Sequence, residues 1–330
     1  MATTERTKPN YSRRFFWLGV FVVVLFGGYS LGWFWLAGRL EAEAKTAITA
    51  LNRDGVKADC ANPTARGYPF RIGLFCDRVA FSDAAQGVSL AAGNFRSAGQ
   101  IYDPMRLVAE LDGPARIDSA RAGAFALDWE NLRASARLST PLPQRLSLEG
   151  VRLKAATADG APLLAAENFQ AHMRPNEQNL DLAGSVSGLA LDSSLLDGRK
   201  VPPLSGQSDI TINDGVRLLG EKVKDLRGQS GTIRELALST GENAGVTLSG
   251  PFSVDDAGLI DANLNITIRD PKGLSAVLAE AVPEKRDQIE QAFSGLAMLG
   301  NAPSLPLRIA KGRATLGFIP LGQIPPLPAR

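Results

Sequence analysis

The sequence is poor in the side chains that metal and nucleophile chemistry needs. It has one histidine, His172, and two cysteines, Cys60 and Cys76. Structural zinc sites take four such ligands and catalytic ones usually three, so no metal site is predicted. A G-x-S-x-G elbow, a Walker A loop and a G-x-G-x-x-G turn are also missing. We expect no cofactor and no enzymatic activity, although a hydrolase built on two distant carboxylates stays open.

The net charge of the chain is also small, and the excess of basic residues is concentrated at the N-terminus. The formal net charge is +2, while the first 14 residues carry four basic side chains, Arg6, Lys8, Arg13 and Arg14, against Glu5 alone. The rest of the chain is therefore close to neutral. It has no basic footprint for nucleic acid, so we expect no nucleic-acid partner.

The longest run without a charged residue extends from Phe15 to Gly38. As a helix it would span about 36 Å, which is enough to cross a bilayer. Aromatic residues gather at both ends of the run, where their rings favour the headgroup level. The basic tail before it predicts a cytoplasmic N-terminus by the positive-inside rule, with the bulk of the chain on the far side of the membrane.

A cleaved signal peptide is the competing interpretation, because Ala42-Glu43-Ala44 has the form that signal peptidase accepts. The apolar core of a signal peptide is about 7–15 residues long, which is shorter than this run. Arg39 and Glu41 also separate the run from the candidate cleavage site. These features favour a retained single-pass anchor that continues into a helical stalk.

From Val56 onward the apolar period changes from helical spacing to two. Short alternating runs between turn signals predict an antiparallel β-sheet, and Ile260 to Ile268 is the cleanest of them. Asp270-Pro271 and Pro283 mark the starts of two short helices near residues 271–300. The predicted fold class is mainly β, with a transmembrane helix and stalk followed by a long curved sheet that forms either a meander with a groove or a sandwich. The predicted organisation is a tail (1–14), a transmembrane helix (15–38), a stalk (39–55) and a β-rich domain (56–330).

The two cysteines lie on neighbouring predicted strands and most simply form one disulfide in an oxidising compartment. The bond would close a loop of about 17 residues, worth about 3 kcal/mol in the chain-entropy model. Two buried free thiols are the alternative. In the stretch around Cys76 we expect Phe70, Ile72 and Leu74 to face inward, with a bulge or bend near Asp77 where the apolar parity shifts.

A long sheet with two short helices to cover it must curl, pair with another sheet or leave an apolar face open. An open face outside a membrane predicts a lipid groove, for which the candidate lining residues are Ile260, Leu264, Ile266 and Ile268. The alternative is a filled β core that serves as an envelope scaffold or a protein-interaction module. The pattern alone favours neither.

Three ordered phrases resemble the domain of unknown function 2125 family of membrane-anchored bacterial envelope proteins. They are Arg66–Ile72 (RGYPFRI), the YDP segment that leads to a G-P turn in 101–117, and the GFIPLGQIPPL ending at 317–327. A more distant resemblance, to AsmA-type proteins, implies an inner-membrane anchor with a curved periplasmic β-sheet and a role in lipid transport or envelope maintenance. The closer family defines no functional residues that could be carried over.

Overall fold

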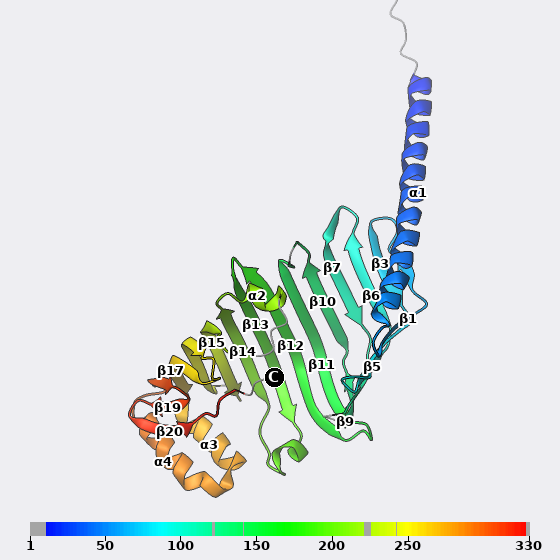
Figure 1. The fold of residues 1–330 in the computed structure, drawn as a ribbon. Helices are drawn as coiled ribbons and strands as arrows, with labels where there is room; N and C mark the ends of the chain where they lie inside the picture. The colour runs from blue at the N-terminus through cyan, green and yellow to red at the C-terminus, as the bar shows by residue number, and fades with distance from the viewer. Residues whose placement is uncertain (1–10, 121–122, 141, 221–225, 242, 328–330) are drawn as a thin grey trace, which may run out of the picture.

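The computed structural model describes residues 11–120, 123–140, 142–220, 226–241 and 243–327. Within them, helix α1 (Tyr11–Leu51) leads into one 20-stranded sheet in which every pairing is antiparallel. Helices α3 (Pro271–Ala281) and α4 (Arg286–Ala297) lie at the opposite end of the sheet from α1 (Figure 1). The predicted mainly β fold class is confirmed, and the sheet is not closed. Residues 1–10 of the predicted tail lie outside the described residues.

Helix α1 runs without interruption through the predicted span and through most of the predicted stalk (39–55), as far as Leu51. It is long and apolar enough to cross a membrane, and it carries no proline. The helix ends just before Asp54 and Gly55, whose φ angles are 54° and 87°. This left-handed backbone is costly for most residues but not for glycine, so it turns the chain out of the helix and into the first strand.

The N-terminal half of the sheet divides into two branches. The first branch consists of β1 (Val56–Ala61), β4 (Arg78–Asp83), β5 (Val88–Ala92), β8 (Ala115–Ser119) and β9 (Gly123–Asp128). The second consists of β2 (Thr64–Arg66), β3 (Arg71–Cys76), β6 (Phe95–Gln100), β7 (Asp103–Leu111) and β10 (Asn131–Arg137). Both end on β11 (Arg145–Thr157), whose first half pairs with β10 and whose last residues pair with β9.

A crease separates the two branches. The chain crosses it at short breaks in successive strands, at Asp77, Gly93–Asn94, Asp112–Pro114 and Trp129–Glu130. Along it, side chains of both branches meet in a core around Trp129, whose indole N–H donates to the Leu111 carbonyl over 2.7 Å. The core also contains Ala92, Ala115, Val79, Leu90, Leu127, Leu132 and Leu153. The sheet is thus folded on itself along the crease, and the side chains of this cluster are buried or partly buried.

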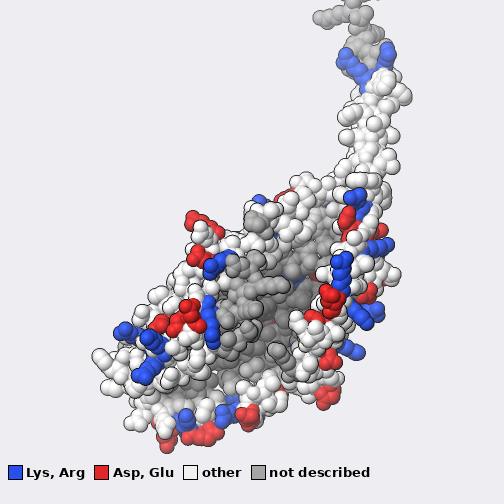
Figure 2. Space-filling view, in the orientation of Figure 1, with Lys and Arg blue, Asp and Glu red and all other residues white. Residues whose placement is uncertain are grey.

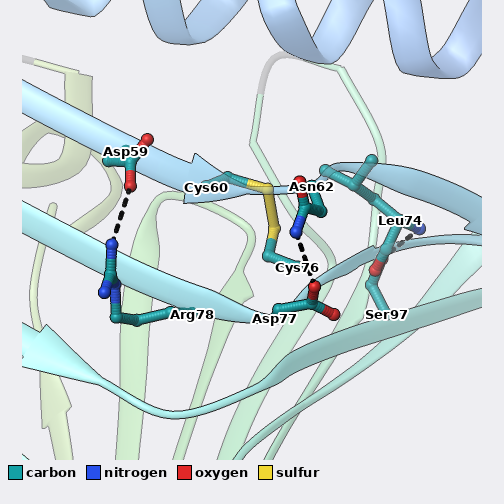
Figure 3. The surroundings of a disulfide bond; sticks show 8 residues. All are labelled: Asp59, Cys60, Asn62, Leu74, Cys76, Asp77, Arg78 and Ser97. Atoms are coloured by element: carbon teal, nitrogen blue, oxygen red, sulfur yellow. Dashed lines mark hydrogen bonds and ion pairs between the residues drawn. A yellow bond between two sulfur atoms is a disulfide. The ribbon is translucent and has the colours of Figure 1, made fainter.

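A disulfide joins the two branches beside α1. Cys60 of β1 is bonded to Cys76 at the end of β3, with Cα atoms 5.3 Å apart (Figure 3). Next to it, the Asn62 amide donates to the Asp77 carboxylate over 2.9 Å. The predicted disulfide is present, and it lies beside the break at Asp77 where the apolar parity shifts.

The rest of the sheet is a single-layered meander in which each strand pairs with the next. Its strands are β12 (Pro162–Asn176), β13 (Asn179–Leu191), β14 (Leu204–Ile212), β15 (Ser230–Thr240), β16 (Ala244–Val254), β17 (Ile260–Arg269), β18 (Ser304–Ala310), β19 (Arg313–Leu316) and β20 (Ile319–Gln323). The connections include α2 (Val216–Gly220) and the 3₁₀ turns η1 (Ser193–Leu196) and η2 (Pro283–Lys285).

Helices α3 and α4 cover the far end of the meander, as the two predicted helices near residues 271–300. The Asp270 side chain accepts from the Gly273 N–H over 3.1 Å, and Pro271 occupies the first turn, so α3 starts with a side-chain cap. Apolar residues of both helices pack on Ile268 and Ala244 of the sheet; they are Leu274, Leu278, Phe293 and Leu296. The face of the sheet that these helices cover is the same face that carries the apolar side chains of the neighbouring strands of the meander.

Candidate functional site

The concave side of the sheet contains an open apolar cavity of about 1440 Å³. It crosses nine adjacent strands, β6, β7 and β10 to β16, and its surface is almost entirely apolar. No Lys, Arg, Asp or Glu is among the described residues that line it. Figure 2 shows the hollow with charged side chains along its rims. A cavity of this kind suits an apolar ligand larger than the drug-sized molecules that fill pockets of about 300–1,000 Å³.

The alternation of side chains along each strand builds this face. In β11, Leu146 and Leu148 point to the cavity, while Ser147 between them points to the convex side. The antiparallel register then carries one apolar row across the strands, formed by Ala134, Leu148, Ala171, Gly184, Ser208, Leu236 and Leu248. A second row contains Phe169, Val186, Gly206, Leu238 and Val246. The cavity is therefore a property of the register and is not made by any single segment.

Small residues in these rows give the cavity its depth. Gly184 and Gly206 lie in the middle strands, and a Cβ at Gly206 would already lie 3.4 Å from Val186 Cγ1. Large apolar side chains of the same face stay open to solvent; Leu238 is 52% exposed and Leu148 is 37% exposed. In the filled core of a sandwich such side chains would be buried. The exposure distinguishes an open groove from the closed alternative.

The convex side of the same strands is polar, and one carboxylate on it accepts hydrogen bonds from the neighbouring strands. Asp181 of β13 is 5% exposed and accepts from Thr211 over 2.8 Å. Arg174 donates to it from β12 and Arg234 from β15, over 3.1 and 3.3 Å. Arg234 also pairs with Asp209. This network joins four neighbouring strands directly behind the cavity floor.

The surroundings of Asp181 favour its ionised form. Burial acts to raise the pKa of this carboxyl, but hydrogen bonds from Thr211, Arg174 and Arg234 outweigh it and hold the pKa below its ordinary value. The pKa of the Arg234 guanidinium is raised, first by its hydrogen bond to Asp209 and then by Asp181. Both groups are therefore charged at neutral pH, and the network is electrostatically matched.

The lone histidine also belongs to the convex side. His172 Nδ1 lies 2.8 Å from the Ser147 hydroxyl of the neighbouring strand, in register with it. The adjacent pair on the concave side is Leu148 and Ala171. Among the described residues, no group of three or more His, Cys, Asp or Glu side chains could hold a metal ion.

A second, smaller cavity of about 740 Å³ lies on the first branch. Its lining is mixed, because Phe81, Leu90 and Ile117 share it with charged residues. Those are Lys57, Asp59, Arg116 and Asp118. It therefore does not continue the uncharged character of the main cavity.

The four predicted groove residues occupy β17, and none of them lines the cavity. They face the same side of the sheet, since Leu248 is in register with Ile266 and Val246 with Ile268. Helices α3 and α4, however, cover this part of the face, so that Ile268 is buried and Ile266 packs beside it. Ile260 and Leu264 are half-buried on the same strand. Here the face is a core, and the open groove lies on the strands before it.

Sequence reasoning missed the groove because it selected the most regular alternation. On β17 the alternation is clean, and helices α3 and α4 cover its end at Ile266 and Ile268. On β12 to β14 glycine and serine interrupt it, at Gly184, Gly206 and Ser208. Strands in which small residues interrupt the apolar alternation, and which lie between other predicted strands and away from the two predicted helices, are the sequence signal that would have predicted the groove on β12 to β14.

The second departure concerns Phe70, which was expected to face inward. It lies in the loop before β3 and is 69% exposed, whereas Ile72 and Leu74 on the strand itself are half-buried. That loop packs on α1: the Tyr68 hydroxyl lies 2.7 Å from that of Ser30, and the Trp33 indole donates to the Arg71 carbonyl over 3.0 Å. The direction of Phe70 is set by this helix contact and not by the strand.

The comparisons with known proteins agree with this architecture. A family model described as "Uncharacterized protein conserved in bacteria (DUF2125)" matches residues 33–325. The chain belongs to this family. The DUF2125 match starts within α1 and includes all strands of the sheet, so the cavity lies entirely inside it. A comparison with curated proteins found no match. The AsmA-type relationship of this DUF2125 protein stays a prediction.

Proposed function

We propose that this protein is a single-pass inner-membrane protein whose periplasmic sheet holds the acyl chains of a lipid in its concave cavity, in the service of envelope maintenance. The observation that carries the proposal is the uncharged, solvent-open apolar cavity on nine strands. Exposing such a face to water is costly, because each square ångström of apolar surface that a ligand covers is worth about 25 cal/mol. A ligand made of hydrocarbon recovers this free energy without needing polar partners.

The dimensions of the cavity also suit a lipid. Nine strands spaced about 4.8 Å apart give a length of about 38 Å across the sheet. The hydrocarbon of one bilayer leaflet is about 15 Å thick, half of a core of about 30 Å. The cavity is therefore long enough for extended acyl chains, and the polar headgroup would lie at the charged rim (Figure 2).

In this proposal the protein binds or presents its ligand without changing it. The lining offers hydroxyl and amide groups but no carboxylate, amine or thiol among the described residues. General acid–base chemistry needs a titratable group within hydrogen-bond reach of the ligand. His172 is the one titratable residue among the described lining residues, and strand alternation turns its side chain to the convex side, where it pairs with Ser147.

Site-specific photocrosslinking tests the proposal. A benzoylphenylalanine in place of Leu148 or Leu238 of the full-length protein faces the cavity, and one in place of Asn168 provides the matched control. Asn168 is exposed and does not line the cavity, although it is adjacent to Phe169, which does. After irradiation of intact cells and purification, mass spectrometry should find lipid adducts at the two cavity positions and none at the control.

Each other outcome speaks against the proposal. Equal lipid adducts at all three positions would mean contact with bulk membrane, and an absence of lipid at Leu148 and Leu238 would leave the cavity without its ligand. A reproducible protein adduct at the cavity positions would instead support the scaffold or protein-interaction alternative.

A further inference from the structure

We propose that the folded domain has its own membrane contact beside α1, an aromatic seat formed by Tyr68, Phe70 and Tyr102, which inserts into the headgroup region of the bilayer. The seat comes from two segments, the loop before β3 and the turn between β6 and β7. The inference rests on the proposed membrane anchor but is independent of lipid binding in the cavity.

The two segments are held together and against the helix. The Ile101 N–H donates to the Phe70 carbonyl over 3.2 Å, so the β6–β7 turn is tied to the loop. Tyr68 stacks on Phe34 of α1 with ring centres 5.7 Å apart, and Tyr29 donates to the Pro69 carbonyl. Figure 1 shows the β6–β7 hairpin rising next to α1. The seat therefore has a fixed height along the helix.

That height falls inside the apolar run. A hydrocarbon core of about 30 Å that begins at Phe15 extends for about 20 residues, to near Phe34. The contacts of the loop with α1 involve Tyr29, Ser30 and Trp33, all within this stretch. These contacts lie close to the outer end of the stretch. If α1 spans the membrane, they therefore place the loop at the boundary between the hydrocarbon and the headgroups and not in bulk water.

The side chains of the seat fit that position. Phe70 is 69% exposed and Tyr102 is 76% exposed, and they lie on two segments that are hydrogen-bonded to each other. Tyrosine and tryptophan prefer the boundary between hydrocarbon and water, where the ring is buried and the polar group stays hydrated. Arg66 and Arg71 flank the loop and are exposed, at the level where anionic phosphates lie.

The seat also fixes where one end of the cavity lies relative to the membrane. Strands β6 and β7, which carry the turn with Tyr102, supply Phe95, Ser97 and Leu107 to the cavity lining. With the turn in the headgroup region, this end opens at the bilayer surface while the cavity extends away from it. A lipid would then enter from the membrane at β6–β7 and not from the far end, where α3 and α4 cover the face.

Depth-dependent fluorescence quenching tests the seat. The full-length protein is reconstituted in vesicles of phosphatidylethanolamine and phosphatidylglycerol, and a nitrobenzoxadiazole label is attached to one introduced cysteine, from Phe70→Cys or Tyr102→Cys. The native cysteines are paired in the disulfide and do not react. Val24→Cys in α1 and Phe318→Cys at the opposite end of the sheet are the controls. All four positions are exposed, so the label disturbs no packing.

Lipids with a nitroxide near the headgroup should quench the label at positions 70 and 102 strongly, and leave position 318 unquenched. A nitroxide deep in the acyl chains should quench position 24 best. If positions 70 and 102 behave like position 318 while position 24 is quenched, the seat does not exist although the anchor does. If position 24 is also unquenched, both the anchor and the seat are refuted, whatever the crosslinking experiment shows for the cavity.

Discussion

The two halves of the sheet use the same alternating strands but bury their apolar faces differently. In the N-terminal half the sheet folds along the crease, and the side chains around Trp129 form a core. In the meander, β12 to β16 form one layer, and Leu238 on the equivalent kind of face is 52% exposed. A sheet that folds on itself buries its apolar face against its own strands. A sheet that stays single-layered leaves that face exposed to solvent unless another molecule covers it.

Two substitutions measure this difference most directly. Trp129→Ala removes a buried indole and its hydrogen bond, and should lower the free energy of unfolding by about 3–5 kcal/mol. Leu238→Ala in the open face should cost less than about 1 kcal/mol. Chemical denaturation of the full-length protein in detergent gives both values. Equal costs would mean that the two halves bury their faces alike.

The disulfide should stabilise only the N-terminal half of the sheet, where the sheet folds along the crease. Replacing both cysteines, Cys60→Ser with Cys76→Ser, should lower the free energy of unfolding by about 3 kcal/mol because the loop between them is no longer closed in the unfolded chain. Lipid crosslinking at Leu148, in the meander, should be unchanged. Loss of that crosslink in a variant that is still folded would show that the halves are coupled.

A smaller effect than that of the disulfide is expected in the convex network of the meander. Asp181→Asn should lower the free energy of unfolding by about 2 kcal/mol at neutral pH, since two arginines lose their charged partner but stay partly solvated. Because the pKa of Asp181 is lower in the folded state, its contribution is complete above about pH 4 and is lost as the pH falls through the folded pKa.

The measurement is a series of unfolding curves of wild type and Asp181→Asn between neutral and acidic pH. The two should converge at the acid end. A difference that grows as the pH falls would contradict the assignment of a lowered pKa. Asp256→Asn, at a turn between β16 and β17, is a control that should change little at any pH.

Much of the fold followed from local patterns in the sequence. The uncharged run from Phe15 predicted a helix of the observed kind, and the parity shift near Asp77 coincides with the break between β3 and β4 at the crease. Local signals are sufficient there, because a slip of one residue turns every later side chain to the other face. The disulfide between Cys60 and Cys76 was also predicted and is present, although their strands do not pair with each other: β1 pairs with β4, and β3 pairs with β2 and β6.

The position of the candidate site did not follow, because it depends on what covers each strand. The run from Ile260 to Ile268 has the best alternation, but α3 and α4 cover its end at Ile266 and Ile268, while the less regular β12 to β14 stay open. Phe70 alternates correctly with Ile72 but belongs to a loop that α1 holds outward. Neither case can be read from one strand, since both are decided by contacts between segments far apart in the chain.

By itself, the sequence determined an apolar helix, a β-rich chain with two faces of opposite polarity, and a pair of cysteines able to bond. These depend on residue type and spacing, which act locally through helix geometry and the strand period of two. Only the tertiary structure decided that the apolar face is folded into a core at one end, covered by helices at the other and open between them. Whether a face is buried depends on long-range packing, which no local period encodes.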